Sequence, residues 1–209
     1  MDDLRISALL CTRLCHDLIG PAGAVVNGIE LLSDSPGNVD NEVLELIRHS
    51  ASETTRRLKY FRVALGIPAD DLSLAATRAI ADDYFATSKI ALEWSDSIME
   101  TPTPTRLVPI ILNLVLCGAE SLPRGGRIAI DGAPVGGGFR LLIEAAGETI
   151  KADDNALLSL SGNRDLSTLD ARGLAPYMAA RLVSAAGGKI DTTPSAGSIE
   201  FSVTLPTAL

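Results

Sequence analysis

The pair His16-Asp17 has the clearest capacity for chemistry in this sequence, and it lies in an apolar segment with helical spacing. Neutral imidazole is a nucleophile near neutral pH because its ordinary pKa is about 6.5. A neighbouring carboxylate can accept a hydrogen bond from Nδ1–H, which fixes the tautomer and leaves Nε2 free to attack phosphorus. The pair therefore predicts a nucleophilic histidine, His16, that is oriented by Asp17.

Arg13 and two glycines extend this candidate site along the same segment. Arg13 lies three residues before His16 on the same helical face, from which its guanidinium could approach phosphoryl oxygens. The alternative for Arg13 is a solvated charge. Gly20 and Gly23 follow His16 by four and seven residues, so a partner helix could approach the backbone closely there.

A long helix must position these side chains. Apolar residues recur at helical spacing from about residue 2 to residue 33, and the period resumes after Gly20-Pro21. We therefore predict a single helix that kinks at Pro21 instead of ending before it.

A second helix is predicted from about Glu42 to Leu65, with Asp40 or Asn41 as its N-cap. Its apolar residues follow alternating steps of four and three, as in the seam of a helical bundle. Two helices joined by a short turn cannot bury both apolar stripes, and a second copy of the hairpin is the simplest source of two more. Residues 1–66 thus predict a homodimeric four-helix bundle for dimerisation and phosphotransfer.

Residues 67–209 have a different pattern, and Gly66-Ile67-Pro68 marks the boundary. Helical segments alternate there with strand-like segments that are bounded by glycine-rich turns. Helices on one face of a mostly antiparallel sheet are expected, which makes the fold class α+β. The expected helices span 75–85, 106–122 and 173–186, and the expected strands span 90–94, 127–131, 139–145, 189–192 and 198–205.

Composition limits the partners and the location. The formal net charge of −8 argues against a nucleic-acid surface, which needs clustered Lys and Arg. The most apolar run, residues 107–117, is too short to span a membrane. The first residues show no signal-peptide pattern, and an odd number of cysteines suits free thiols in the cytoplasm. Cys11 and Cys15 could join His16 only as an incomplete zinc site, so no metal site is predicted.

The segment from Arg13 to Pro21 resembles the phospho-acceptor box of two-component histidine kinases, in which His is followed by Glu or Asp, an aliphatic residue, two variable residues and Pro. The order of elements after Pro68 resembles the ATP-binding domain of these kinases, the GHKL fold. Residues 111–119 resemble its N-box, residues 143–150 its first glycine box, residues 172–176 its second glycine box, and residues 187–206 its closing hairpin.

Several nucleotide-binding positions of these boxes are changed. The first asparagine of the N-box is present as Asn113, but the second is Cys117, and a thiol is a poor ligand for Mg²⁺, which prefers oxygen. The adenine-recognising aspartate of the first glycine box is Ala145, and a later glycine is Thr149. Pro176 removes an N–H from the second box, where phosphates are normally cradled. We therefore expect that ATP is not bound and that the chain has no cofactor-binding site.

A histidine hairpin joined to a nucleotide-free kinase-like domain is similar to the ChpT-type histidine phosphotransferases of alphaproteobacteria. The similarity implies that His16 accepts a phosphoryl group from a receiver-domain aspartate of a CckA-like hybrid histidine kinase. It implies transfer onward to CtrA-like and CpdR-like response regulators in cell-cycle regulation, with Mg²⁺ supplied by the partner receiver. Partner binding is assigned to Gly20, Gly23 and Asn27. In bifunctional kinases the position of Gly20 often carries a polar residue that directs a water molecule for dephosphorylation. Because this chain has glycine there, its phosphatase activity should be weak.

Two other functions remain open from the sequence. The chain could be an ATP-dependent histidine kinase with an atypical nucleotide site, which would bind ATP tightly. It could also be a receiver-binding scaffold, in which His16 would never carry a phosphoryl group.

Overall fold

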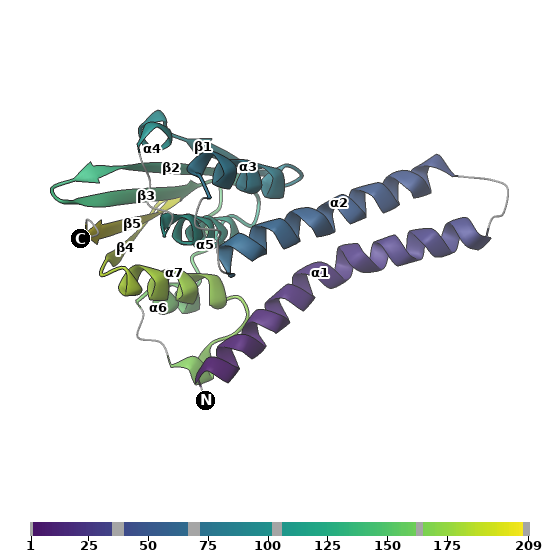
Figure 1. Cartoon of the computed structure of the whole chain (residues 1–209), viewed down its shortest axis with the longest axis horizontal. Helices are drawn as coiled ribbons and strands as arrows, with labels where there is room; N and C mark the ends of the chain where they lie inside the picture. Colours follow the sequence, from purple (N-terminus) through teal and green to yellow (C-terminus); the bar gives the residue numbers. More distant parts are fainter. Residues whose placement is uncertain (1, 35–39, 67–71, 102–105, 162–164, 207–209) are drawn as a thin grey trace.

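The computed structural model describes residues 2–34, 40–66, 72–101, 106–161 and 165–206. A long helical hairpin projects from a sheet that is covered by helices (Figure 1). The hairpin consists of α1 (Asp2–Asp34) and α2 (Asn41–Ala64). The later elements are α3 (Leu74–Phe85), β1 (Ile90–Trp94), α4 (Asp96–Glu100), α5 (Leu107–Glu120), β2 (Gly126–Val135), β3 (Gly138–Ala146), α6 (Asp154–Leu160), the 3₁₀ helix η1 (Leu166–Thr168), α7 (Leu174–Ala185), β4 (Lys189–Ser195) and β5 (Ser198–Pro206).

The two hairpin helices form where the apolar period predicts them. α1 runs through Pro21 without a break, which confirms the single long helix. Asp40 is the N-cap of α2, and its carboxylate accepts a hydrogen bond from Glu42 N–H at 2.8 Å. The helices pack tightly at Gly28, where a Cβ atom would lie 2.5 Å from Ile47 Cγ1. A larger residue at 28 would therefore push the hairpin apart.

The sheet has the strand order β1-β2-β3-β5-β4, in which only the β1–β2 pair is parallel. Burial alternates along the strands, so that one face carries buried apolar side chains such as Ile143 and Phe201, which are paired across β3 and β5. α3, α5 and α7 pack against the sheet, and α6 packs on α7. This arrangement confirms the α+β fold class and the mostly antiparallel sheet.

The last turn of α2 belongs to the core of the sheet domain. Tyr60, Phe61, Val63 and Ala64 are all buried there, and the Tyr60 hydroxyl donates to the carbonyl of Leu112 in α5 at 2.8 Å. Two of the three boundary residues predicted at 66–68 belong to the segment 67–71, which lies outside the described residues. The division into residues 1–66 and 67–209 stays a prediction.

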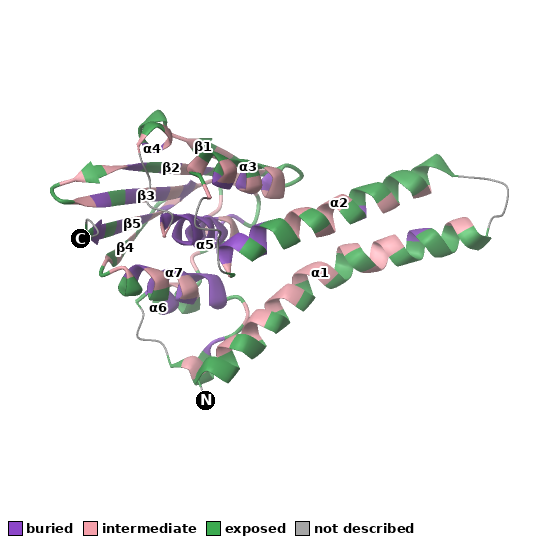
Figure 2. Ribbon diagram, in the orientation of Figure 1, coloured by how far each residue is buried: buried purple, intermediate pink, exposed green. Residues whose placement is uncertain are grey.

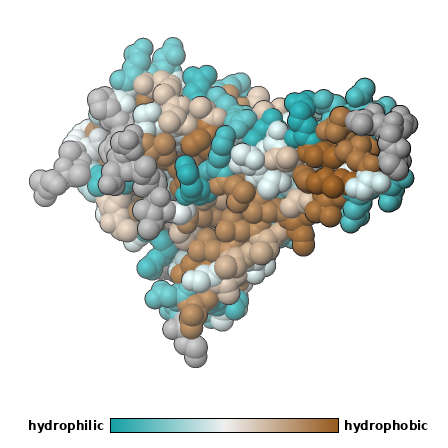
Figure 3. Space-filling model, turned by 45° about the vertical axis from the view of Figure 1, so that its right-hand side comes forward, coloured by the Kyte–Doolittle hydropathy of each residue, from teal (hydrophilic) through white to brown (hydrophobic). Residues whose placement is uncertain are grey.

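Away from the sheet domain, most of the hairpin is exposed or half-buried (Figure 2), and apolar residues of α1 are among its exposed positions. On α1 the exposed fractions are 73% for Ile19, 55% for Val26 and 52% for Ile29. Figure 3 shows a continuous apolar area along the hairpin. By length and composition alone α1 could also cross a membrane, but the core helices of water-soluble proteins pass the same test. The exposed fractions show that the described part of the chain leaves this apolar face of the hairpin uncovered.

Candidate functional site

His16 stands on the solvent side of α1, and its side chain is 82% exposed. Its Nδ1 lies 2.9 Å from Oδ1 of Asp17, the next residue along the helix. The carboxylate has no proton to donate, so this contact selects the imidazole tautomer with hydrogen on Nδ1 and a lone pair on Nε2. The structure thus brings together the nucleophile and the orienting residue that the sequence predicts, with Nε2 open to a partner.

Arg13 is the centre of a charged cluster beneath the histidine. Its Nε donates to Asp17 Oδ2 at 2.7 Å, and its Nη2 lies 2.7 Å from Glu120 Oε1 at the end of α5. A third nitrogen, Nη1, lies 3.4 Å from the carbonyl of Ala171. Burial disfavours the guanidinium cation, but Glu120 and Asp17 outweigh it and raise the pKa of Arg13. Arg13 is therefore a permanent cation that joins α1 to the sheet domain.

The backbone carbonyl that Pro21 leaves without a partner in α1 accepts a hydrogen bond from the second helix. Proline has no N–H, so the carbonyl of Asp17, four residues earlier, lacks its usual partner in the helix. Nη1 of Arg57 in α2 donates to this carbonyl, while Nε of Arg57 is held by Glu53 Oε1 at 2.9 Å. Arg57 thereby fixes the backbone of the residue that orients His16. Sequence reasoning missed this role.

A hollow with a volume of about 670 Å³ opens beside His16, between α1 and the sheet domain. Arg13, His16 and Asp17 line it from α1, and Cys117 and Glu120 line it from α5. Segments 151–153 and 170–172 contribute a lysine, an arginine and two aspartates. Burial raises the pKa of Glu120, and the attraction of Arg13 opposes that effect only partly. Cys117 of the N-box and Arg172 of the second glycine box line the hollow, whereas no residue of the first glycine box is part of its lining.

The N-box side chains are committed to packing. Asn113 is fully buried, and its Nδ2 donates to the carbonyl of Ala64 at 2.5 Å and to that of Pro109 at 2.8 Å. It therefore caps the end of α2 instead of facing the hollow. Cys117 is 5% exposed, and burial raises the pKa of its thiol well above the ordinary value. A neutral thiol is a weak donor and offers no anionic ligand.

Two changed positions of the glycine boxes, Ala145 and Pro176, lie in the core of the sheet domain and in the first turn of α7. Ala145 is fully buried under α5, where a Cβ on Gly118 would come within 3.1 Å of its own Cβ. At the start of α7 the carboxylate of Asp170 accepts a hydrogen bond from Gly173 N–H at 2.8 Å. Pro176 lies in the first turn of α7, where it contributes no N–H. A helix start that is already paired with a carboxylate is a poor site for phosphate.

The predicted partner-binding residues lie along α1 beyond His16. A Cβ atom added at Gly20 or Gly23 would meet no atom within 4 Å, and Asn27 is exposed. These positions are therefore open in the single chain. The close contact to α2 is made by Gly28 instead, which the sequence analysis did not distinguish from its neighbours.

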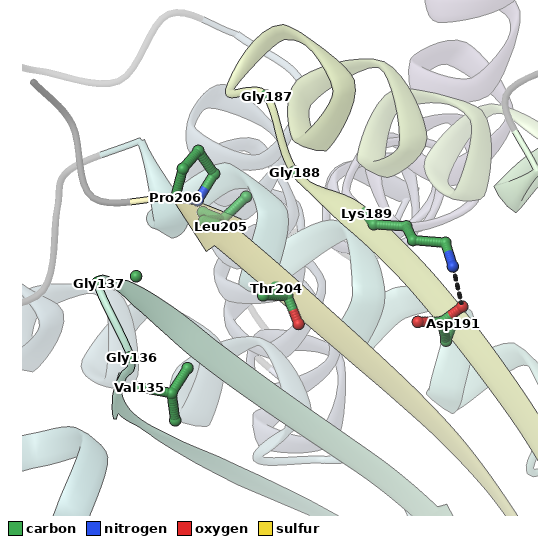
Figure 4. A pocket seen from close by; sticks show the side chains of 11 residues that line it. Val135, Gly136, Gly137, Gly187, Gly188, Lys189, Asp191, Thr204, Leu205 and Pro206 are labelled. Atoms are coloured by element: carbon green, nitrogen blue, oxygen red, sulfur yellow. Dashed lines mark ion pairs between the residues drawn. The ribbon is translucent and has the colours of Figure 1, made fainter.

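A second hollow lies at the far end of the sheet, by the β2–β3 turn, and Figure 4 shows its glycine-rich rim. Its two charged side chains, Lys189 and Asp191, pair with each other at 3.2 Å. The described residues that line it include no histidine or cysteine. Among the residues that the structure describes, no group of three or more His, Cys, Asp or Glu side chains is placed to hold a metal ion.

Comparisons with known proteins agree with this geometry. Residues 74–197 match the family model of the histidine phosphotransferase C-terminal domain. The protein phosphotransferase ChpT of Brucella abortus (strain 2308) is 32% identical over 202 residues, which cover 95% of each chain. A bacterial phosphotransferase solved at 1.7 Å superposes with a TM-score of 0.81 and 31% identity over 96% of both chains. The histidine kinase AdeS of Acinetobacter baumannii has a TM-score of 0.50 and 14% identity over 93% of this chain and 98% of its own, and shares the fold alone.

Proposed function

Because the chain belongs to the ChpT-type histidine phosphotransferase family, we propose that His16 carries a phosphoryl group between the aspartates of two receiver domains. A phosphotransferase role in a phosphorelay follows from the family; the residues and the steps are our proposal. The observation that supports them best is the exposed imidazole of His16, whose Nδ1 is held by Asp17 at 2.9 Å while Nε2 faces solvent.

In the first step, the lone pair of His16 Nε2 attacks the phosphorus of an aspartyl phosphate on the incoming receiver. A P–N bond forms as the P–O bond to the aspartate breaks, and the receiver aspartate leaves as a carboxylate. The ring becomes a phosphorylated imidazolium that keeps its Nδ1 proton, and the Asp17 carboxylate stabilises this positive charge. In the second step, an aspartate of another receiver attacks the phosphorus, the P–N bond breaks and neutral imidazole returns.

Arg13 is assigned to positioning rather than to direct contact with the phosphoryl group. Each of its three guanidinium nitrogens already has a partner, and its side chain is only 13% exposed. An approach to phosphoryl oxygens would require Arg13 to give up one of two charged partners. Its contribution is therefore to hold the carboxylate of Asp17, which in turn holds His16.

A second copy of the chain is the proposed cover for the apolar face of the hairpin. Ile19, Val26 and Ile29 are among the large aliphatic residues of α1 that are more than half exposed. Burying apolar surface contributes about 25 cal/mol per Å², and an isologous pairing of two hairpins would bury each of them twice. We propose that the phosphotransferase works as this homodimer, with two copies of His16 on the outside of a four-helix bundle.

The partners belong to the proposal as well. They are the receiver domain of a CckA-like hybrid kinase upstream, and CtrA-like and CpdR-like response regulators downstream, in the cytoplasm. Mg²⁺ would be held by the acidic pocket of the receiver. Gly20, Gly23 and Asn27 would face the receiver, because they continue the exposed surface of α1 beyond His16.

The proposal is tested by incubating the protein with a receiver domain that carries a radiolabelled aspartyl phosphate. We expect an acid-labile label on the wild-type chain and none on His16→Ala, while His49→Ala serves as the control for the other histidine. Labelled ATP alone should give no label. A label from ATP would support a kinase, and no label from either source would support a scaffold; both outcomes would refute transfer through His16.

A further inference from the structure

Glu120, the last residue of α5, connects the sheet domain to the nucleophile through consecutive contacts. Its Oε1 lies 2.7 Å from Nη2 of Arg13, and Nε of Arg13 donates to Asp17 Oδ2 at 2.7 Å. The other carboxylate oxygen of Asp17 lies 2.9 Å from His16 Nδ1. Anion, cation, anion and imidazole therefore follow one another from the sheet domain to the reactive ring. The sequence gives no reason to select Glu120, and the reaction steps above do not use it.

Further contacts hold this end of the sheet domain against α1. Arg5 donates to the carbonyls of Leu166, Ser167 and Leu169 in and after η1, with distances of 2.8 Å to Ser167 and 3.1 Å to Leu169. Figure 1 shows this segment beside the first turns of α1. Because these contacts fix the two domains relative to each other, Glu120 has a defined position from which to act on Arg13.

We propose that Glu120 is a positioning residue for phosphoryl transfer, which acts on His16 through Arg13 and Asp17. The proposal rests on the function assigned to His16 above. Without the Glu120 carboxylate, the Arg13 cation would lose one of its two charged partners, and its guanidinium would be held less firmly against Asp17. The Asp17 carboxylate could then turn away from Nδ1–H, and the imidazole would lose its fixed tautomer and orientation. In this way the former nucleotide domain would control the reactivity of the histidine without binding a nucleotide.

The tautomer of His16 is the readout that a merely structural role would leave unchanged. The chain has only two histidines, and His49 lies exposed on α2, so its side chain serves as an internal reference in ¹⁵N NMR spectra. At a pH where the ring is neutral, we expect wild-type His16 to be the Nδ1–H tautomer. Glu120→Gln and Arg13→Gln should both shift His16 toward the Nε2–H tautomer that prevails in free histidine, with His49 unchanged.

Transfer kinetics provide the second measurement. Glu120→Gln should lower the single-turnover rate of transfer from a phosphorylated receiver about tenfold. The dissociation constant of the receiver should stay within about twofold, because Glu120 acts on the ring and not on docking. Glu144→Gln is the matched control, since Glu144 pairs with Arg127 at 3.0 Å and its side chain is 34% exposed, against 33% for Glu120. It should transfer at the wild-type rate.

Glu120→Gln and Asp17→Asn, alone and combined, test whether the contacts from Glu120 to His16 act in series. If they do, Glu120→Gln should slow transfer much less in an Asp17→Asn background than in the wild type. The proposal is overturned if Glu120→Gln leaves both the tautomer and the rate unchanged, or if it slows transfer equally in both backgrounds. If the wild-type chain takes up no label, the assigned function fails, but the tautomer measurement still decides the role of Glu120 because it needs no receiver.

Discussion

Arg57 gives a stability prediction that depends directly on the proline in α1. Arg57→Met keeps an unbranched apolar stem but removes the donor that pairs with the carbonyl of Asp17. A hydrogen bond to a charged group contributes about 1.5–3 kcal/mol. The Arg57 side chain is 31% exposed, so solvent screening reduces this and we expect a loss of about 1–2 kcal/mol in the free energy of unfolding.

The cause of this loss can be tested by restoring the missing backbone donor. Pro21→Ala provides an N–H four residues after Asp17, and the helix can then satisfy that carbonyl without Arg57. In the Pro21→Ala background, Arg57→Met should therefore cost about 1 kcal/mol less than in the wild type. The two costs of Arg57→Met should differ only if the Arg57 guanidinium and the N–H of residue 21 donate to the same carbonyl. The difference between the two costs therefore measures this one contact.

Urea denaturation followed by circular dichroism measures the four free energies, and all variants must be compared at one protein concentration because dimerisation would contribute to stability. Arg48→Met is the matched control on the same helix, since Arg48 pairs only with its exposed neighbour Glu45 among the described ion pairs. It should cause no measurable change. Equal losses for Arg57→Met in the two backgrounds would refute the explanation.

Three further predictions concern the site and the hairpin. Asp17→Asn should slow phosphoryl transfer about a hundredfold, because the amide no longer selects the Nδ1–H tautomer; a rate within a factor of about two of the wild type in the receiver assay would contradict its orienting role. Since burial raises the pKa of Glu120, the folded state binds this proton more tightly than the unfolded chain. The stability of the wild type relative to Glu120→Gln should therefore be greatest below the ordinary glutamate pKa of about 4.3 and fall as pH rises through the raised value; denaturation series that show a constant or rising difference would be inconsistent with this burial. Ile29→Asp should weaken dimerisation about a hundredfold or more, because symmetry places the charge in the interface twice; a dimer of unchanged affinity in sedimentation equilibrium would place the interface elsewhere.

The course of α1 could be predicted from the sequence because the apolar period resumes after Pro21. The hydrogen bond that Arg57 donates to the carbonyl of Asp17 could not be predicted, because Arg57 lies far along the chain on the second helix. A single arginine with a glutamate four residues before it is typical of an ordinary solvent-exposed pair on a helix. Only the packing of the hairpin shows that one of its nitrogens reaches the carbonyl of Asp17.

The contact between His16 and Asp17 was predictable for a similar reason, since the two residues are neighbours in the sequence and their contact is local. Glu120 was not predictable, because it ends an almost entirely apolar helix where a charged residue usually meets solvent. Its pairing with Arg13 depends on how the sheet domain sits on α1. The short elements α4, α6 and η1 were missed as well, since five, seven and three residues carry too little periodicity to be recognised.

Asn113 has a packing role that its place in the N-box resemblance does not predict. The sequence shows the first N-box asparagine in place, which in isolation favours a nucleotide site. In the structure its amide is fully buried and donates to the carbonyls of Ala64 and Pro109. The changed positions Cys117 and Ala145 are buried as well. Asn113 thus helps to join the hairpin to the sheet domain.

The central claim is that phosphohistidine 16 is an intermediate on the path between two receivers. It is tested most directly by isolating the protein labelled at His16, removing the donor, and mixing it with a second receiver in the presence of Mg²⁺ and without ATP. The account predicts that the label leaves the histidine at the same rate at which it arrives on the aspartate of the second receiver. Label that stays on the protein, or that appears only as inorganic phosphate, would contradict the account.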